Sequence, residues 1–349
     1  MKIVAAVEVD RHACNTYRRN LVKDGVPKLY EFDINELDPN TLIDDCFSDI
    51  ATCDIVLGGP PCQGFSVHRI NDAGKGDPRN ELIHRYFEFV SMLQPRAFLL
   101  ENVPGMLWPR HAGVLKKFYS EAKRAGYNVL PPAVLDARDY GIPQRRKRVF
   151  ILGLRVDVLE PSDWIPPKTH RSLADLRRYQ GLKPWVPCAA VFKRKNRKSD
   201  PSNIHMQHST ELVALFKRTP ANGGSRQDSG RVLPCHQDHD GHKDVYGRID
   251  PSKPAPTMTT ACINPSKGRF LHPTKHHGIT LRQAARLQGF PESFVFKGGL
   301  ISGGVQVGNA VPVRLAQLLL RRLGEILKRD RCRPANDYAI DSHCLNAAE

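Results

Sequence analysis

Short apolar runs alternate with amphipathic stretches over the first 155 residues of the chain. The runs have the length and apolar character of buried strands, and the stretches between them repeat apolar side chains at helical spacing. The candidate strands cover residues 3–7, 28–32, 55–57, 97–100 and 149–154, and the candidate helices cover residues 13–21, 82–92 and 114–125. Strands and helices in alternation predict an α/β fold with a doubly wound, mainly parallel sheet.

Acidic side chains and one glycine-containing loop follow four of these candidate strands. Glu8 follows the first strand, Asp33 the second and the loop 58–66 the third, while Glu101 comes directly after the fourth. Ligands of doubly wound sheets bind outside the carboxyl ends of the strands. The sequence therefore predicts a site where three carboxylates meet Cys62, the cysteine of the loop.

The alternation stops near residue 156. The sequence that follows has proline-rich pieces, a basic run at residues 193–198 and no readable strand–helix pattern, which predicts a smaller and irregular second domain. A helical pattern returns after Thr280, a candidate N-cap, and again over residues 311–327. We therefore assign residues 1–155 and 266–327 to the first domain, 156–265 to the second, and 328–349 to a polar tail.

The basic charge of the chain is concentrated in its middle. The protein has 52 Lys and Arg residues against 36 Asp and Glu, a formal net charge of +16. Counting along the sequence gives 16 basic against 18 acidic residues up to position 137, 20 against 8 over 138–231, and 16 against 10 over 232–349. This regional excess favours a surface that binds a polyanion such as nucleic acid, although a solubilising surface has the same composition.

Cysteine usage and hydropathy indicate a soluble protein of a reducing compartment. The nine cysteines include no Cys-x-x-Cys pair, and no run of about 18 apolar residues occurs. We expect a cytoplasmic protein without membrane contact, associated with the nucleoid in a bacterium. Cys235, His236, His239 and His242 are candidate zinc ligands, but they lack a partner cysteine pair, so we predict no metal site.

The loop after the third candidate strand carries the chemistry. It runs Gly58-Gly-Pro-Pro-Cys-Gln-Gly-Phe-Ser66, where glycines allow close backbone approach and prolines restrict the loop that presents Cys62. It resembles the Pro-Cys-Gln loop of the DNA cytosine-5 methyltransferases. Five further segments resemble motifs of that family in the same order, at residues 77–80, 101–103, 144–148, 282–291 and 306–311. Gln283 departs from the pattern, because the family often has a glutamate there.

The resemblance implies transfer of a methyl group from S-adenosylmethionine to C5 of a cytosine flipped out of duplex DNA. Cys62 would add to C6 of the base as a thiolate, and Glu101 would hold and protonate N3. Arg146 and Arg148 would orient Glu101 and contact the base oxygen and the target phosphate. Two alternatives stay open: a tRNA cytosine-5 methyltransferase of the same fold, and a DNA-binding homologue without catalysis.

The resemblance also implies binding residues and partners. The S-adenosylmethionine contacts would come from Glu8, Val9, Asp33, Ile34, Pro60, Leu82, Asn309 and Ala310. The DNA contacts would come from Gln63, Ser66, Arg79, Lys193, Arg194, Lys195 and Arg226. Residues 156–265 would form the target-recognition domain. We expect double-stranded DNA as the partner, a cognate restriction endonuclease as a functional counterpart, and a monomer.

The start of the chain departs from the family pattern. Members usually have a strand, a Phe-x-Gly-x-Gly loop and a helix before the segment that residues 3–8 resemble, whereas Met1 here stands seven residues before Glu8. In the family, this loop brings backbone N–H groups to the methionine part of the cofactor. We therefore expect a truncated or misplaced start, a sheet without its central strand, and poor binding of S-adenosylmethionine.

Overall fold

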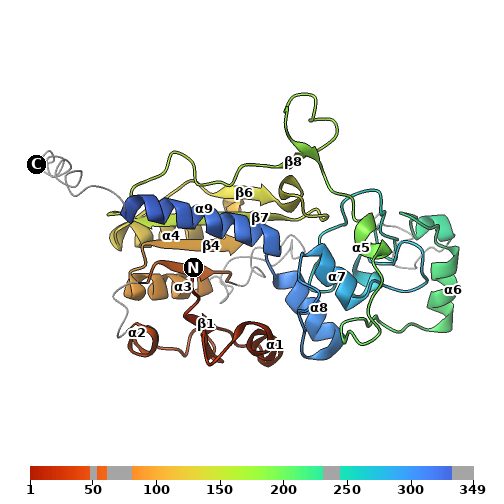
Figure 1. Ribbon diagram of the computed structural model, residues 1–349, viewed down its shortest axis with the longest axis horizontal. Helices are drawn as coiled ribbons and strands as arrows, with labels where there is room; N and C mark the ends of the chain where they lie inside the picture. Colours follow the sequence, from red (N-terminus) through yellow and green to blue (C-terminus); the bar gives the residue numbers. More distant parts are fainter. Residues whose placement is uncertain (48–52, 61–80, 231–243, 332–349) are drawn as a thin grey trace, which may run out of the picture.

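The computed structural model describes residues 1–47, 53–60, 81–230 and 244–331, which form two lobes. One lobe holds strands β1–β7 with helices packed around them, and the other holds the shorter helices α5–α8 and long loops (Figure 1). The predicted α/β class is therefore confirmed. Among the helices of these described residues, none is long and apolar enough to cross a membrane.

The strands of the first lobe form two hydrogen-bonded sheets. In one, β1 pairs with β2 in parallel; in the other, β3 pairs with β4 in parallel, and β7 pairs antiparallel with β4, β5 and β6. The sequence predicted a single sheet. The structure has β1 and β2 in one sheet and β3 to β7 in another. The strand bounds are β1 Ala5–Val7, β2 Lys28–Tyr30, β3 Ile55–Gly58, β4 Ala97–Asn102, β5 Tyr127–Val129, β6 Ala133–Asp136 and β7 Lys147–Arg155.

Helices cover both faces of β4. Successive side chains of a strand point to opposite faces of the sheet, so neighbouring residues of β4 pack against different helices. Phe98 and Leu100 pack against α3 (Glu81–Leu93) and α4 (Ala112–Arg124). Ala97 and Leu99 pack in a second cluster with α9 (Val313–Arg331). All four of these strand side chains are buried. Burial on both faces explains why the sequence of this strand is continuously apolar rather than alternating.

Helices α1 (Arg11–Leu21) and α2 (Pro39–Cys46) flank the β1–β2 sheet. Each begins at an aspartate, Asp10 or Asp38, whose side chain accepts a backbone N–H of the first turn. A small core around Tyr30, which includes Phe89 of α3, connects this sheet with the rest of the lobe. The sequence pattern predicted α1 but not α2, whose eight residues are too few to show a clear period.

The larger core of the second lobe is shared by distant segments. Its buried side chains range from Cys188 to Val307 and include residues on both sides of position 265, where the sequence suggested a boundary. A smaller cluster is formed by Leu215 and Phe216 of α6 with Leu271. The helices of this lobe are α5 Ala189–Lys193, α6 Thr210–Arg218, α7 Leu281–Leu287 and α8 Gly299–Asn309, and the short strands β8 His170–Arg171 and β9 Lys183–Pro184 precede them. The tail after Arg331 and the candidate zinc ligands at 235–242 lie outside the described residues.

Two histidines of the second lobe make its stability depend on pH. Burial lowers the pKa of His272 to about 3 and that of His277 to about 4. An unfolded histidine titrates near pH ~6.5, so the unfolded chain binds more protons than the folded chain at intermediate pH. The stabilising contribution is therefore complete above that pH and is lost as the pH falls toward the folded pKa values.

We expect the free energy of unfolding to fall between pH 7 and pH 5, with His272 contributing a slope that rises to about 1.4 kcal/mol per pH unit at the acid end of this range. Denaturant titrations at each pH measure this slope. The variant His272→Asn keeps an acceptor near the Nδ1 position and does not titrate, so its stability should fall less. His12→Asn, at an exposed histidine, is the matched control. The same pH dependence in wild type and His272→Asn would refute the prediction.

Candidate active site

A tight turn at the end of β3 leads into the loop that carries Cys62. A Cβ on Gly58 would lie 2.2 Å from the Tyr86 ring, so only glycine fits there. Gly59 faces the site, since a Cβ on it would lie 3.5 Å from Oε2 of Glu101. The Asn102 side chain donates to the carbonyl of Pro60 at 3.2 Å and holds the turn against the end of β4. Sequence reasoning gave Asn102 no role; its place beside Glu101 was the available signal.

Glu101 and Arg148 form the charged centre of the site. The two residues extend from the neighbouring strands β4 and β7, and Arg148 Nε lies 2.9 Å from Glu101 Oε1. Burial raises the pKa of Glu101, and the positive charges of Arg148 and Arg146 partly oppose that rise. The carboxyl group is therefore protonated more readily than a free glutamate, and the guanidinium of Arg148 lies beside it.

Arg146 has a structural task in addition to its charge. Its side chain is 1% exposed and donates to the carbonyls of Met258 at 2.8 Å and Gly308 at 2.7 Å. Arg146 therefore ties the start of β7 to the second lobe, and it affects Glu101 through its field. The predicted contacts of Arg146 with a base oxygen and a phosphate stay predictions.

Two buried glutamines extend this connection between the lobes. Gln144 accepts the N–H of Met258 at 2.8 Å and donates to the side chain of Gln288 at 2.8 Å. Gln288 in turn donates to the carbonyls of Val307 and Ala310 at 2.6 and 3.0 Å. These two residues belong to sequence motifs but were not among the predicted site residues. They position the ends of α7 and α8 relative to β7.

Two carboxylates lie at the carboxyl ends of the paired strands β1 and β2. Glu8 Oε1 accepts the N–H groups of Val9 and Asp10 at 3.0 and 2.9 Å, and Asp33 Oδ1 accepts that of Asn35 at 2.9 Å. The second oxygen of each carboxylate has no hydrogen-bond partner among the described residues. Val9 is 66% exposed beside them. The arrangement offers two oriented acceptors and an apolar surface, which fits an adenosine.

The remaining predicted cofactor residues have less distinct environments. Ile34 accepts a hydrogen bond from Arg85 through its carbonyl at 2.8 Å, and Leu82 is half-buried in the first turn of α3. Asn309 is exposed at the end of α8. Four predicted residues lie outside the described part of the chain: Cys62, Gln63, Ser66 and Arg79.

The predicted DNA-binding residues of the second lobe differ in accessibility. Lys193, the last residue of α5, and Lys195 are exposed. Arg194 is also exposed, but its Nη1 lies 3.5 Å from Oε1 of Glu292. Arg226 is only 3% exposed, which does not favour a phosphate contact for its side chain.

Four thiols of the described residues are poor nucleophiles. Burial raises the pKa of Cys53 to about 11 and the pKa values of Cys188 and Cys262 to about 12, and it also raises the pKa of Cys14. A thiol with a raised pKa carries little thiolate at neutral pH. Among the described residues there is also no group of three His, Cys, Asp or Glu side chains that could hold a metal ion.

Solved structures with the same fold are methyltransferases. A protein described as a DNA modification methyltransferase encoded within an E. coli prophage matches with a TM-score of 0.68 and 24% identity, over 93% of this chain and 92% of that chain. The S. pombe Dnmt2 methyltransferase matches with a TM-score of 0.55 and 18% identity, over 93% and 91% of the two chains. At these identities the comparison shows the fold.

Sequence comparisons identify the family. The Type II methyltransferase M1.HphI of Haemophilus parahaemolyticus is 31% identical over 315 residues, which is 90% of this chain and 78% of the relative. The Type II methyltransferase M1.BsuMI of Bacillus subtilis is 32% identical over 330 residues, 90% and 72% of the two chains. The model of the C-5 cytosine-specific DNA methylase family matches residues 1–325. The chain therefore belongs to this family, the DNA (cytosine-5) methyltransferases.

Proposed function

We propose that this protein transfers a methyl group from S-adenosylmethionine to C5 of a cytosine in duplex DNA through a covalent adduct with Cys62. The observation that supports this proposal most directly is the pair of Glu101 and Arg148, which lies against the Gly59 turn leading to Cys62. A buried carboxyl group held by an arginine beside a nucleophile loop suits a base that must be protonated while it is attacked.

The first step forms a bond between the Cys62 sulfur and C6 of cytosine. The C5–C6 π electrons move to C5, and N3 takes up a proton as negative charge reaches the ring. Glu101 supplies that proton, because its pKa is raised by burial, and its other oxygen accepts the exocyclic N4–H. Arg148 fixes the plane of the carboxyl group throughout.

The second step uses the electron pair at C5 to form the C5–CH3 bond. When bound, S-adenosylmethionine supplies this methyl group as an electrophile. A base, for which water suffices, then removes the proton from C5. The C5–C6 double bond re-forms as the bond from C6 to the Cys62 sulfur breaks, N3 returns its proton to Glu101, and the thiolate is regenerated.

The cofactor is held, in this proposal, at the ends of β1 and β2. Glu8 would accept the ribose hydroxyls, and Val9 would lie against the adenine. Asp33 and Ile34 would meet the adenine amino group. The same ligand would also be held by Pro60, Leu82, Asn309 and Ala310. Two oriented carboxylates beside an exposed apolar side chain support this assignment.

The substrate base must leave the duplex, since the thiolate attacks C6 from the face of the ring. Flipping costs a few kcal/mol of stacking and pairing, which contacts from the basic second lobe offset. Gln63, Ser66 and Arg79 would contact the DNA near the flipped base. We further propose a cytoplasmic monomer that protects DNA from a restriction endonuclease with the same recognition sequence, as the Type II relatives suggest.

Methyl transfer to different nucleic acids tests the proposed function. We expect the protein, given labelled S-adenosylmethionine, to methylate unmethylated genomic DNA at one sequence context, with 5-methylcytosine in the sequenced product. A tRNA arm is run in parallel with equal protein and cofactor. If the methyl group were transferred to tRNA alone, the substrate would be tRNA, and the proposed DNA substrate would be wrong. DNA binding without transfer to either substrate, at saturating cofactor, would favour the homologue without catalysis.

A further inference from the structure

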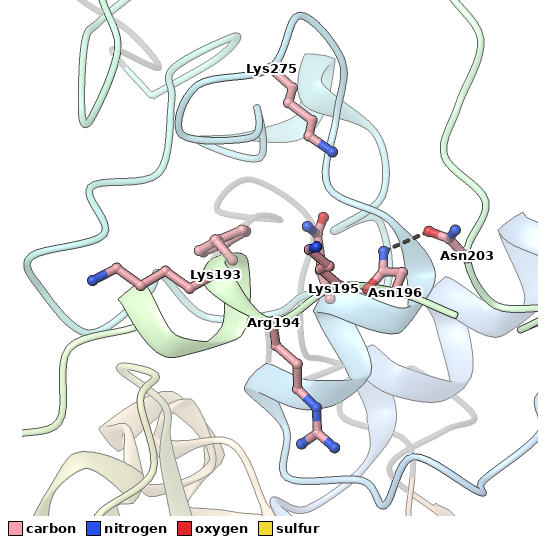
Figure 2. Close-up of a pocket in the computed structure, with 8 residues that line it drawn as sticks. Lys193, Arg194, Lys195, Asn196, Asn203 and Lys275 are labelled. Atoms are coloured by element: carbon pink, nitrogen blue, oxygen red, sulfur yellow. Dashed lines mark hydrogen bonds between the residues drawn. The ribbon is translucent and has the colours of Figure 1, made fainter. Parts of the chain in front are cut away.

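A basic pocket of about 330 Å³ lies in the second lobe. It is lined by residues 192–196, at the end of α5 and just after it, by Asn203, and by Lys275 and Gln283. Figure 2 shows Lys275 extending from its loop toward Lys195 and Asn196, whereas the Lys193 and Arg194 side chains extend away. Lys275 and Gln283 were not among the DNA-binding residues predicted from the sequence.

The Gln283 amide presents only its N–H groups to this pocket. Gln283 is 4% exposed, and its Oε1 accepts the backbone N–H of Thr280 at 2.9 Å in a capping box. A backbone N–H can only donate, so this bond fixes which end of the amide is the oxygen. The Nε2 group of Gln283 has no hydrogen-bond partner among the described residues. A donor without a partner among the described residues therefore lines the pocket.

Hydrogen bonds also fix which end of the Asn203 amide is the oxygen. Arg286 donates to Asn196 Oδ1 at 2.6 Å, and a guanidinium can only donate. The Asn196 Nδ2 group must then be the donor in its 2.5 Å bond to Asn203, whose Oδ1 accepts. The Nδ2 group of Asn203 remains as a second donor lining the pocket.

Among the described residues, no carboxylate lines the pocket. Glu292 is the first acidic residue after α7 in the sequence. It pairs with Arg286 at 2.8 Å and with Arg194 at 3.5 Å. Within the part of the chain that the structure describes, Lys195 and Lys275 form no ion pair. The pocket thus combines two uncompensated ammonium groups with two amide donors.

His272 and Arg248 hold the loop that presents Lys275 through hydrogen bonds. His272 is 4% exposed, and its Nδ1 accepts the N–H groups of Thr274 at 3.2 Å and Lys275 at 3.0 Å. Arg248 donates to the carbonyls of His272 and Lys275. The His272 ring also packs edge-on against Phe192, which lines the pocket, at a centroid distance of 5.3 Å. These contacts fix the direction of Lys275 before any ligand binds.

We propose that this pocket binds one backbone phosphate of the DNA duplex, through Lys195, Lys275 and the amides of Asn203 and Gln283. The inference rests on the proposed function and assigns a specific contact to the second lobe. Four donors without an acceptor match the oxygens of a phosphate. An amide that reads adenine needs an acceptor as well as a donor, and both amide oxygens are already used.

Salt-dependent binding to two duplexes of different composition tests the pocket. Affinities of the wild type and Lys275→Gln are measured for poly(dG·dC) and poly(dA·dT) across a range of salt concentrations. We expect Lys275→Gln to weaken binding to both duplexes equally and to reduce the slope of log affinity against log salt by about 0.9. Lys116→Gln, an equal charge change at an exposed position of α4, should leave the slope unchanged.

A second variant tests the amides without removing a cation. Gln283→Glu keeps the oxygen that accepts from Thr280 and replaces the amide NH2 group by a second carboxylate oxygen. We expect this variant to bind both duplexes more weakly. Its thermal unfolding midpoint should stay near that of the wild type. Wild-type slope and affinity in both variants would overturn the pocket but not the proposed function. If the variants lost affinity for poly(dG·dC) alone, the pocket would bind the edge of a guanine base, and the proposed phosphate contact would be wrong. Failure of the wild type to bind either duplex would overturn both proposals.

Discussion

The variant Cys62→Ala is expected to lose methyl transfer entirely and to form no denaturant-stable complex with DNA that contains 5-fluorocytosine. Fluorine at C5 cannot leave as a proton does, so the wild-type sulfur would stay bonded to C6 after methyl transfer. Without the thiol, no atom of the protein bonds to the base. Denaturing gel electrophoresis of the mixture, with cofactor present, detects the adduct.

Cys53→Ala is the matched control for this experiment. Its thiol lies just before β3 in the same segment, but burial raises its pKa to about 11, so it contributes no nucleophile. We expect this variant to form the adduct as the wild type does. An adduct with Cys62→Ala would show that another group attacks C6, and the proposed mechanism would then be wrong.

The second large effect is expected for Glu101→Gln, with kcat falling by roughly 10²–10⁴-fold. The amide has nearly the same shape but cannot transfer a proton to N3. Steady-state rates with saturating DNA and cofactor measure the change. Glu121→Gln removes a carboxylate that pairs with His84 on the outer helices, and it should leave kcat unchanged. A Glu101→Gln enzyme with near wild-type kcat would exclude Glu101 as the acid.

Arg148→Met links this effect to the electrostatics of the site. The rate should fall with rising pH as Glu101 loses its proton, because only the protonated carboxyl group donates to N3. Arg148 lowers the pKa of Glu101 against the larger effect of burial, so its removal should move this fall to higher pH. An unmoved pH profile would mean that a group other than Glu101 controls the fall.

The sequence alone predicted the α/β class and the place of the charged centre. Strands such as β4 and β7 are buried and continuously apolar, so their pattern is visible without knowledge of their neighbours. Glu101 was located because strand ends in this fold class meet at one edge of the sheet. Its pairing with Arg148 follows from the register of β4 and β7, in which Glu101 lies opposite Phe150.

Elements that depend on long-range packing were not visible in the sequence. Helix α8 contains Gly303, Gly304 and Gly308, which disfavour a helix locally. Tertiary packing requires them, since a Cβ on Gly308 would lie 2.3 Å from the backbone of Thr260. Strands β5 and β6, with three and four residues, are formed by pairing with β7.

The sequence by itself thus determined the α/β class and identified the residues that we propose to carry the chemistry, because residue type and local period are properties of neighbouring positions. The tertiary structure alone decided how distant groups meet. Arg146 binds carbonyls 112 and 162 positions away, and Gln283 joins Lys275 and Asn203 in one pocket. Such contacts depend on buried hydrogen bonds and packing between segments, whose approach is set by the folded chain as a whole.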